Sequence, residues 1–496
     1  MDTQLLIDGE LKDTKEKHKV INPSNGQVIA EVSVASVRDV EVALAAARSA
    51  FDQGPWPRLT LPERKAFILK IAQGILDRAE ELAQLESANT GKPIKESTFM
   101  DIPSAAKTFE YFANNLENYL RPETIKISAQ TGDAESVLMR EPHGVVVLIV
   151  PWNYPLLIAC WKMAQALAAG NTVILKPSSL TPLTALALGR IIYDAGLPQG
   201  AVNILNGPGA VLGEVLCKDK RVDMVSFTGS NEVGKRIIND SAEHVKKLVV
   251  ELGGKSAGIV FKDADLELAV NGLLCSIFLN QGQMCTAMSR ILVAEEIYDA
   301  FISEFCAKAK RIKLGSAEDF QTQMGPLVSD LQRKKVLMYI EKAKKEGSRL
   351  LCGGVIPAAE AFHKGFFLEP AVLSEVSSAM TIFKEEVFGP VACIDKFSSL
   401  NGAVVLANES EFALACSLWT QDIDLAKETA QKINAGTIWI NTYGMFYNEV
   451  PYGGFKQSGF GKELGKDGFY EYCRLKNVIV DASKGSKPLV NYWYGF

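Results

Sequence analysis

The sequence predicts an α/β fold built around a doubly wound parallel sheet. From Gly144 onward, five short apolar runs alternate with segments of helical pattern. Uninterrupted apolar strands separated by helices are typical of a parallel sheet that is covered on both faces. Sheets of this dinucleotide-binding type hold their ligands at the carboxyl ends of the strands. A second α/β pattern begins after Gly254, so we expect two α/β domains.

The elements of the first pattern have recognisable limits. Pro155 suits the first turn of a helix, and Gly170 and Gly196 suit the ends of two helices. Strands are expected at 145–150, 172–175, 201–205, 222–227 and 247–250, and helices at 155–169, 181–196, 210–217 and 232–241.

The region before this sheet is mainly helical. Ser36 followed by Asp39 indicates the capped start of a helix, and Pro62 suits the first turn of another. Residues 121–142 are polar and β-like and have no core face of their own, so we expect them to leave the main domain. Helices are expected at 36–51, 62–91 and 102–120, and strand-like pieces at 20–29 and 32–34.

The second pattern is less regular. The runs SAGIVF and RILVAE indicate strands, with a helix at 266–280 between them and a long helix through Lys310 after them. A later helix ends at Ala435-Gly436, before a strand at 437–440. The tail from Leu475 is strand-like and rich in aromatic residues.

Composition excludes several classes of protein. The 496 residues carry 53 basic and 58 acidic side chains, a net charge of −5, so a nucleic-acid partner is not expected. Nine cysteines without a CxxC pair and four scattered histidines argue against a disulfide scaffold and against a metal site. The N-terminus lacks the apolar segment of a signal peptide, so we expect a cytoplasmic protein.

One uncharged stretch, 144–161, has the length of a membrane span. Pro151, Asn153 and Pro155 interrupt it, and β-branched residues crowd its first third. A buried strand, a turn and a helix explain this pattern better, and no contact with a membrane is expected.

Some residues at the predicted strand ends could bind phosphate. Gly229 and Ser230 open a helix, and the N–H groups of a helix N-terminus bind anions. Lys176 ends another strand, within reach of a ribose or phosphate, although a solvated turn is the simpler interpretation. The segment NGPGAVLG at 206–213 is one residue too long for the GxGxxG pattern and is equally consistent with a plain Gly-rich turn.

Two further residues could carry covalent chemistry. Glu251 ends the fifth strand, and Cys285 follows an apolar helix in NQGQMCT. A thiol can act as a nucleophile while a nearby carboxylate activates water. Taken singly, a buried cysteine is more often inert packing and a glutamate at a strand end more often a surface acid.

Six ordered segments resemble the aldehyde dehydrogenase superfamily, and within it the betaine-aldehyde and aminoaldehyde dehydrogenases. They are PWNYPLLIACWKMAQALAAGNTVILKPS, FTGSNEVG, VELGGKS, NQGQMCT, EEVFGPV and PYGGFKQSGFGKELG. The resemblance implies a dinucleotide-binding domain at 1–120 and 143–254, a catalytic domain at 255–456, and oligomerisation segments at 121–142 and 475–496. It also implies a homodimer or homotetramer that uses NAD or NADP.

The resemblance further implies a mechanism. Cys285 would attack the aldehyde, Asn153 and the Cys285 N–H would stabilise the oxyanion, and Glu251 would activate the water that releases the acid. Lys162 and Glu463 match positions on a proton path from the general base, but a structural ion pair is an equally good interpretation. Implied cofactor residues are Trp152, Lys176, Ser179, Gly229, Ser230, Leu252, Glu386 and Phe388, and implied substrate-pocket residues are Tyr154, Trp161, Leu279 and Tyr452.

The sequence departs from the family pattern at one implied cofactor residue and at two implied substrate-pocket residues. Ser179 stands where many NAD-dependent relatives have a glutamate that binds the adenosine ribose, so we expect NADP to be tolerated or preferred. Tyr452 replaces a tryptophan of the ring cage that binds quaternary ammonium substrates, and Leu279 replaces an aromatic residue of plant members. A partial cage suits betaine aldehyde, ω-aminoaldehydes or apolar and aromatic aldehydes, and Trp161 could instead be ordinary packing.

Two other functions remain open from the sequence. The first is a coenzyme A-acylating enzyme, which would transfer the acyl group to the thiol of coenzyme A instead of to water. The presence of Glu251 argues against this alternative, because a thiol acceptor does not need a base that activates water. The second is a non-catalytic structural or binding member of the superfamily. The presence of Cys285, Glu251 and Asn153 together argues against this alternative, because such a protein would not need them.

Overall fold

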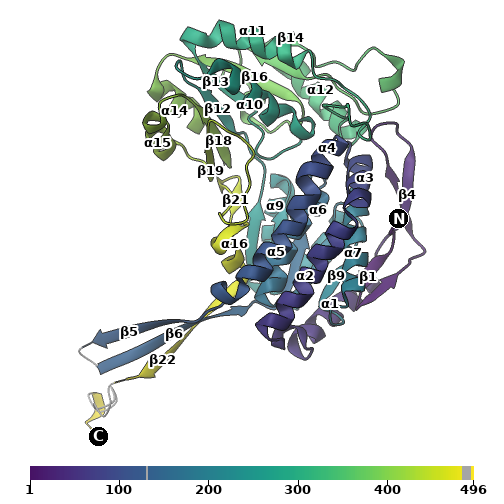
Figure 1. Ribbon diagram of the computed structural model, residues 1–496, viewed down its shortest axis with the longest axis vertical. Coiled ribbons are helices and arrows are strands. Elements are labelled where there is room, and N and C mark those ends of the chain that lie inside the picture. The colour runs from purple at the N-terminus through teal and green to yellow at the C-terminus, as the bar shows by residue number, and fades with distance from the viewer. Residues whose placement is uncertain (130–131, 483–492, 496) are drawn as a thin grey trace.

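The computed structural model describes residues 1–129, 132–482 and 493–495 (Figure 1). It has two lobes, each built on a β-sheet, and a β-stranded arm that projects from the lower lobe. The lower lobe contains an eight-stranded sheet in the order β2-β1-β9-β8-β7-β10-β11-β21, and the upper lobe a seven-stranded sheet in the order β14-β15-β16-β13-β12-β18-β19. The predicted α/β fold is confirmed.

All five predicted strands form the parallel centre of the lower sheet. Their order is doubly wound, because the chain moves outward from β7 first to one side and then to the other. The bounds are β7 (Val145–Ile149), β8 (Thr172–Lys176), β9 (Val202–Ile204), β10 (Met224–Thr228) and β11 (Lys247–Glu251).

The parallel centre of this sheet gains antiparallel strands at both edges, which the sequence did not predict. The hairpin of β1 (Leu5–Ile7) and β2 (Glu10–Lys12) adds antiparallel to β9. At the other edge, β21 (Gly459–Phe460) pairs antiparallel with β11. These pieces are too short to produce a periodic pattern, and their partners lie far away in the sequence. They cover edges that would otherwise expose unpaired backbone groups.

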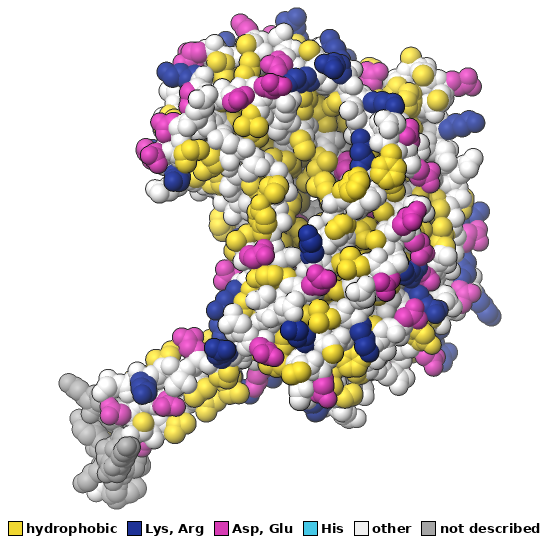
Figure 2. Space-filling view, in the orientation of Figure 1, with side chains coloured by type: hydrophobic (Ala, Val, Ile, Leu, Met, Phe, Trp, Pro, Cys, Tyr) yellow, Lys and Arg dark blue, Asp and Glu magenta, His cyan; other side chains and the backbone are white. Residues whose placement is uncertain are grey.

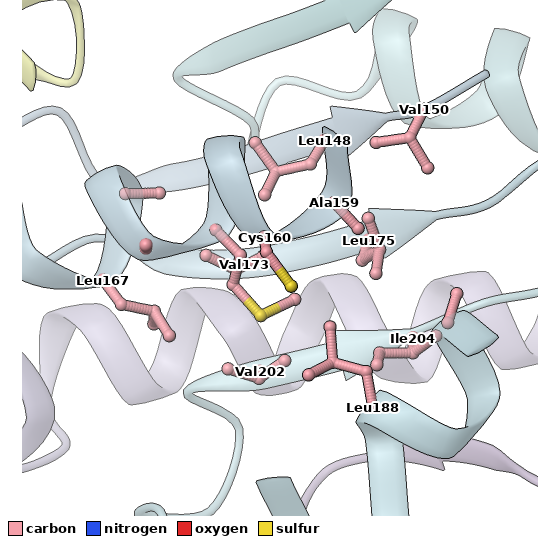
Figure 3. Close-up of a cluster of buried hydrophobic side chains, with 14 of the residues drawn as sticks. Leu148, Val150, Ala159, Cys160, Leu167, Val173, Leu175, Leu188, Val202 and Ile204 are labelled. Atoms are coloured by element: carbon pink, nitrogen blue, oxygen red, sulfur yellow. The ribbon is translucent and has the colours of Figure 1, made fainter. Parts of the chain in front are cut away.

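Helices pack on both faces of this sheet, and a dense apolar core lies between them (Figure 3). Fourteen of the fifteen residues of α6 (Pro155–Ala169) are buried, which explains why its sequence is apolar on all sides. No helix in the described part of the chain is long and apolar enough to span a membrane. The other helices of this layer are α7 (Leu183–Ala195), α8 (Glu214–Lys218) and α9 (Asn231–Ser241).

The N-terminal helices follow the predicted signals, with one exception. Ser36 and Asp39 form a capping box at the start of α1 (Val37–Asp52), as predicted. The helix expected at 62–91 is instead two helices, broken at Arg78, whose backbone is non-helical. The Arg78 guanidinium is bonded to Asp2 and Glu81, contacts that no local pattern predicts. The elements here are β3 (Lys17–Ile21), β4 (Val28–Ser33), α2 (Leu61–Asp77), α3 (Ala79–Thr90), α4 (Ile94–Glu96) and α5 (Ile102–Tyr119).

The upper sheet is parallel except for its edge strand β14. The helix predicted at 266–280 ends at Phe278, and the one predicted to reach 435 ends at Lys432. The strands are β12 (Ala257–Val260), β13 (Arg290–Ala294), β14 (Arg349–Cys352), β15 (Ala371–Ser374), β16 (Val391–Phe397), β18 (Ala415–Trp419) and β19 (Thr437–Ile440). The helices are α10 (Leu266–Phe278), α11 (Tyr298–Ala309), α12 (Asp330–Lys345), α13 (Thr381–Lys384), α14 (Leu400–Asn408) and α15 (Ile423–Lys432).

After the upper sheet the chain returns to the lower lobe. β20 (Phe455–Lys456) pairs with β17 (Phe412–Ala413), whereas β21 joins the lower sheet and α16 (Gly465–Glu471) contacts α6. The segment 457–474, which the predicted domains leave unassigned, thus lies against the lower lobe. The domain limits themselves stay a prediction.

The arm is a three-stranded antiparallel sheet formed by β5 (Glu123–Ala129), β6 (Gly132–Pro142) and β22 (Cys473–Asp481). The segment 121–142 therefore does leave the main body and pairs with the C-terminal strand. Within the predicted oligomerisation segment 475–496, residues 483–492 and 496 lie outside the described residues. Hydrophobic side chains are exposed along this arm (Figure 2).

Candidate active site

Three elements bring Asn153, Glu251 and Cys285 together at the carboxyl ends of the lower strands. Asn153 lies in the turn between β7 and α6, Glu251 ends β11, and Cys285 follows the 3-10 turn Leu279–Gly282 that leaves α10. Two cavities, of about 400 and about 350 Å³, are both lined by these three residues. A molecule in either cavity can therefore reach the thiol.

The loop before Cys285 has an unusual backbone. Asn280, Gln281 and Gly282 follow one another with φ values of 46°, 56° and 70°, a left-handed conformation that is uncommon for residues other than glycine. A Cβ atom at Gly282 would lie 2.2 Å from the carbonyl oxygen of Gly389, so glycine is required there. Such strain persists only where the surroundings enforce it, and it concentrates at functional sites.

Hydrogen bonds to residues of the lower lobe hold this loop. The Asn280 N–H donates to the Glu96 carboxylate at 3.1 Å, and Asn280 Nδ2 donates to the Asn153 carbonyl at 3.1 Å. In return, Asn153 Nδ2 donates to the Gln283 carbonyl at 2.9 Å. The loop carrying the thiol and the turn carrying the amide are thereby fixed to one another.

The thiol and the carboxylate share a hydrogen-bond partner. The Tyr452 hydroxyl lies 3.2 Å from Cys285 Sγ and donates to Glu251 Oε1 at 3.2 Å. Burial raises the pKa of Glu251 to about 8, although the nearby Lys162 ammonium opposes this shift. Burial, followed by the Glu251 charge, raises the pKa of the Cys285 thiol well above its ordinary value.

Lys162 and Glu463 form a buried ion pair. Lys162 Nζ also donates to Ser226 Oγ at 2.9 Å, and Gln165 Nε2 donates to the Glu463 carboxylate at 3.4 Å. Glu463 lines the larger cavity together with Glu251. This position, buried and beside the general base, is the one that both sequence-based interpretations, a structural pair and a proton path, require.

The smaller cavity has the polar groups that a dinucleotide requires. It lies beside the N-terminus of α9, where the Ser230 hydroxyl caps the Val233 N–H and the N–H groups before it have no helical partner. Lys176 is buried, and its ammonium donates to the Pro177 carbonyl, which leaves hydrogens for a ribose or phosphate. Glu386 accepts from the Gly254 N–H at 2.9 Å, and burial raises its pKa to about 7. The predicted cofactor residues Trp152, Lys176, Gly229, Ser230, Leu252, Glu386 and Phe388 all line this cavity.

Ser179 is the predicted cofactor residue that the structure does not place on this cavity. Its hydroxyl donates to the Gly207 carbonyl at 2.8 Å, and the neighbouring Ser178 lines the cavity instead. The carboxylate expected of NAD-dependent relatives is nevertheless missing from this position. Gln332, which the sequence analysis did not identify, also lines the cavity and donates to the Phe388 carbonyl at 2.7 Å.

The larger cavity is the candidate substrate pocket. Tyr154, Trp161, Leu279 and Tyr452 all line it, as predicted. The ring centroids of Trp161 and Tyr452 lie 5.8 Å apart, and the ring of Phe446 lies 5.7 Å from Trp161 and 5.2 Å from Tyr452. Phe446 was missed, although the aromatic run after the strand at 437–440 is visible in the sequence.

Tyr154 differs from the other rings of the pocket. The Lys92 ammonium lies 3.9 Å from its centroid, so one face of this ring already contacts a cation. Lys92 is itself buried and bonded to Asp101 at 2.6 Å and to Glu86. Only the remaining face of Tyr154 is available to a substrate.

The structure is similar to many known aldehyde dehydrogenases. The aldehyde dehydrogenase family model matches residues 11–478. The chain is 44% identical to the betaine aldehyde dehydrogenase of Bacillus subtilis over the full length of both proteins, and 41% identical to human mitochondrial aldehyde dehydrogenase, over 96% of this chain and 92% of that protein. The solved structure of Staphylococcus aureus betaine aldehyde dehydrogenase in complex with NAD+ has a TM-score of 0.95 at 40% identity and covers 100% of this chain and 97% of that one. With a thiol, an amide and a carboxylate gathered where two cavities meet, and with these matches along the chain, the protein belongs to the aldehyde dehydrogenase family.

Proposed function

We propose that the protein oxidises an aldehyde to its carboxylic acid with NAD or NADP, through a thioester on Cys285. The observation that carries this proposal is the meeting of the two cavities at Cys285, Glu251 and Asn153. An aldehyde in the larger cavity and a nicotinamide in the smaller one would both reach the thiol. Trp152, Lys176, Gly229, Ser230, Glu386 and Phe388 would hold the dinucleotide, which when bound supplies the hydride acceptor.

The residues of the site account for the remaining chemistry. The Cys285 thiolate attacks the carbonyl carbon and forms a thiohemiacetal. One amide hydrogen of Asn153 Nδ2 is donated to Gln283, and the second is available to the oxyanion, together with the Cys285 backbone N–H. Loss of hydride from the same carbon leaves the thioester. Glu251 then takes a proton from water, whose oxygen displaces the sulfur and yields the acid.

The central test is replacement of the nucleophile. Cys285→Ala is expected to abolish reduction of the cofactor, while the protein still folds and binds it. Cys275, which is exposed and outside both cavities, provides the matched control, and Cys275→Ala should retain wild-type turnover. Turnover of the Cys285→Ala variant at the wild-type rate would overturn the assignment of Cys285 as the nucleophile. Absence of turnover in the wild-type protein would favour a non-catalytic role.

Water, rather than coenzyme A, is the proposed acyl acceptor. Glu251 is buried beside the thiol, where a base for water is required, whereas a thiol acceptor does not need it. Product analysis with and without coenzyme A tests this. The free acid should form at the same rate in both cases, and accumulation of an acyl-coenzyme A would contradict the proposal.

The proposed substrate is an aldehyde that carries a cationic ammonium group, such as betaine aldehyde or an ω-aminoaldehyde. Trp161, Phe446 and the free face of Tyr154 support this choice, because aromatic faces attract quaternary ammonium groups. Loss of the Trp161 ring in Trp161→Ala should reduce kcat/KM for betaine aldehyde about tenfold more than for hexanal. Trp439→Phe, which alters a ring packed behind Phe446, is the control. Equal losses for both aldehydes would favour a general apolar pocket and Trp161 as ordinary packing.

For the cofactor, we propose that NADP is tolerated or preferred. The absence of a carboxylate at Ser179 supports this, because a carboxylate would repel the 2′-phosphate. The Ser179 hydroxyl is already bonded to Gly207, so lower repulsion is a better reason than a new hydrogen bond. A comparison of kcat/KM for the two cofactors decides the question, and a preference for NAD of a hundredfold or more would refute it. Ser179→Glu should shift the ratio toward NAD.

We also propose that the arm makes the protein a homodimer or a dimer of dimers in the cytoplasm. Ile125, Ile127, Val478, Ile479 and Val480 are exposed on the arm, far from either core. Apolar side chains on a projecting sheet are expected to be covered by a partner. Sedimentation analysis should give a species larger than the monomer, and Ile479→Asp should weaken it. A wild-type protein that stays monomeric at micromolar concentration would contradict this.

A further inference from the structure

The Tyr452 hydroxyl lies between the nucleophile and the general base. It is 3.2 Å from Cys285 Sγ and 3.2 Å from Glu251 Oε1, so one oxygen bridges the two groups. A tyrosine has a single hydroxyl hydrogen, and an ionised carboxylate can only accept. With Glu251 ionised, Tyr452 therefore donates to Glu251, and the thiol donates to Tyr452. In this ionisation state the direction of both hydrogen bonds is fixed.

The position of this hydroxyl is itself fixed. Tyr452 N–H donates to the Glu463 carbonyl at 2.7 Å, and the Glu463 N–H returns a bond of 2.7 Å to the Tyr452 carbonyl. The ring is 5% exposed and packs edge-on against Trp161 and Phe446. The side chain is thus held on both its backbone and its ring, which keeps the oxygen at its place between sulfur and carboxylate.

We propose, on the basis of the proposed function, that the Tyr452 hydroxyl carries the proton of the Cys285 thiol to the Glu251 carboxylate. The S–H bond breaks as its proton binds the Tyr452 oxygen, and the original Tyr452 O–H proton moves to Glu251 Oε1. Tyr452 ends neutral, Cys285 becomes a thiolate, and Glu251 becomes a carboxylic acid. One negative charge has moved from carboxylate to sulfur, and the positions of the heavy atoms need not change.

The Tyr452 hydroxyl is hydrogen-bonded to both the thiol and the carboxylate, and the thiol needs a base to ionise. Burial raises the pKa of Glu251 to about 8 and raises that of the thiol well above its ordinary value, so the thiol does not ionise readily by itself. In the thiolate state Tyr452 donates to sulfur instead, which stabilises the charge. Other titratable groups also face the trio. They are Glu386, Tyr154 and Tyr443 toward the thiol, and Lys162 and Glu463 toward the carboxylate.

The carrier can also work in reverse at the end of the cycle. When Glu251 has taken a proton from water and the acid has left, the same two bonds return that proton to the thiolate. The proton that Glu251 accepted in the first step goes to solvent, which matches the net release of one proton per aldehyde oxidised to the acid. A phenylalanine or a tryptophan at this position has no hydroxyl to perform either transfer.

Alkylation of Cys285 by iodoacetamide in the cofactor-free protein tests the proposal. The rate, followed by mass spectrometry of the Cys285 peptide, is measured against pH for wild type and Tyr452→Phe. Loss of the hydroxyl should raise the apparent pKa of the thiol, and a rise of one unit lowers the rate near pH 7.5 about tenfold. Tyr443→Phe is the matched control, because its hydroxyl contacts Thr286 Oγ1 rather than the thiol, and its rate should stay within about twofold of wild type. Wild-type rates and pH midpoint in Tyr452→Phe would overturn the proposal.

A second measurement needs no variant and covers the case in which Tyr452→Phe fails to fold. The burst of cofactor reduction by wild type is followed in mixtures of H2O and D2O. Transfer through Tyr452 moves two protons, so a plot of the burst rate against the deuterium fraction should be curved. A straight line would mean that only one proton moves and would refute the role of Tyr452 as a carrier. Absence of any burst would instead refute the proposed function, so the two failures are distinguishable.

Discussion

Removal of the Lys162 ammonium should affect stability and catalysis separately. Lys162 and Glu463 side chains are 0% and 3% exposed, so Lys162→Met leaves a carboxylate buried without its cation. Loss of one partner of a buried pair costs about 3–5 kcal/mol. The double variant Lys162→Met/Glu463→Leu removes both charges and should recover most of this free energy of unfolding, since an apolar pair of similar volume is often neutral.

The catalytic effect of the same change acts on Glu251. Lys162 lowers the pKa of Glu251 against the larger effect of burial, so its removal should raise that pKa above about 8. A rise of one unit would reduce the ionised fraction at pH 7 from about one in eleven to about one in a hundred, a loss of roughly ninefold. At a pH far above the Glu251 pKa of both proteins, wild type and Lys162→Met should deacylate at the same rate if the Lys162–Glu463 pair is purely structural.

Two assays separate these effects. Urea unfolding, monitored by tryptophan fluorescence, gives the stabilities, and the pH dependence of steady-state acid formation gives the pKa of the base. A single variant as stable as wild type would refute the argument about the buried pair. A pH midpoint that does not move upward would refute the effect on Glu251. A double variant that is stable but deacylates slowly at every pH would identify Lys162 and Glu463 as a proton path.

The remaining predictions concern the base, the loop and the oxyanion. In wild type, acid formation should increase as pH rises through about 8, because Glu251 accepts a proton only when ionised, and a rate independent of pH from 6 to 9 would contradict this. Gly282→Ala should lose at least about 1–2 kcal/mol from its left-handed backbone alone, measured by unfolding, and should also lower kcat, because its Cβ would meet Gly389. Asn153→Ala should lower kcat about 100- to 1,000-fold in steady-state assays, and a loss under tenfold would place the oxyanion elsewhere.

Much of the lower lobe could be predicted because its determinants are local. Apolar runs and their glycine and proline limits located the five parallel strands within one or two residues. Once the strands are parallel, residues at their carboxyl ends must lie at one edge, which is why Asn153, Lys176, Gly229 and Glu251 come together.

The features that could not be predicted depend on segments that return from far along the chain. β21 and the Tyr452–Glu463 backbone pair reach the lower lobe only after the chain has built the upper sheet. The left-handed run at Asn280 and Gln281 carries no sequence signal except the glycine that follows it. Its conformation is enforced by Glu96 from α4 and by Asn153 from the turn after β7.

The hydroxyl oxygen of Tyr452, which bridges the thiol and the base, is another feature that the sequence could not predict. The sequence identifies Tyr452 as a pocket ring, and by that criterion phenylalanine or tryptophan would serve equally well. Its hydroxyl acquires a distinct role only because residues 167 and 201 positions away place a sulfur and a carboxylate on either side of it. A change of a single oxygen, Tyr452→Phe, leaves the aromatic wall in place and removes the bridge. A difference in thiol reactivity between the wild-type protein and Tyr452→Phe would therefore measure the chemical role of the hydroxyl separately from the packing of the ring.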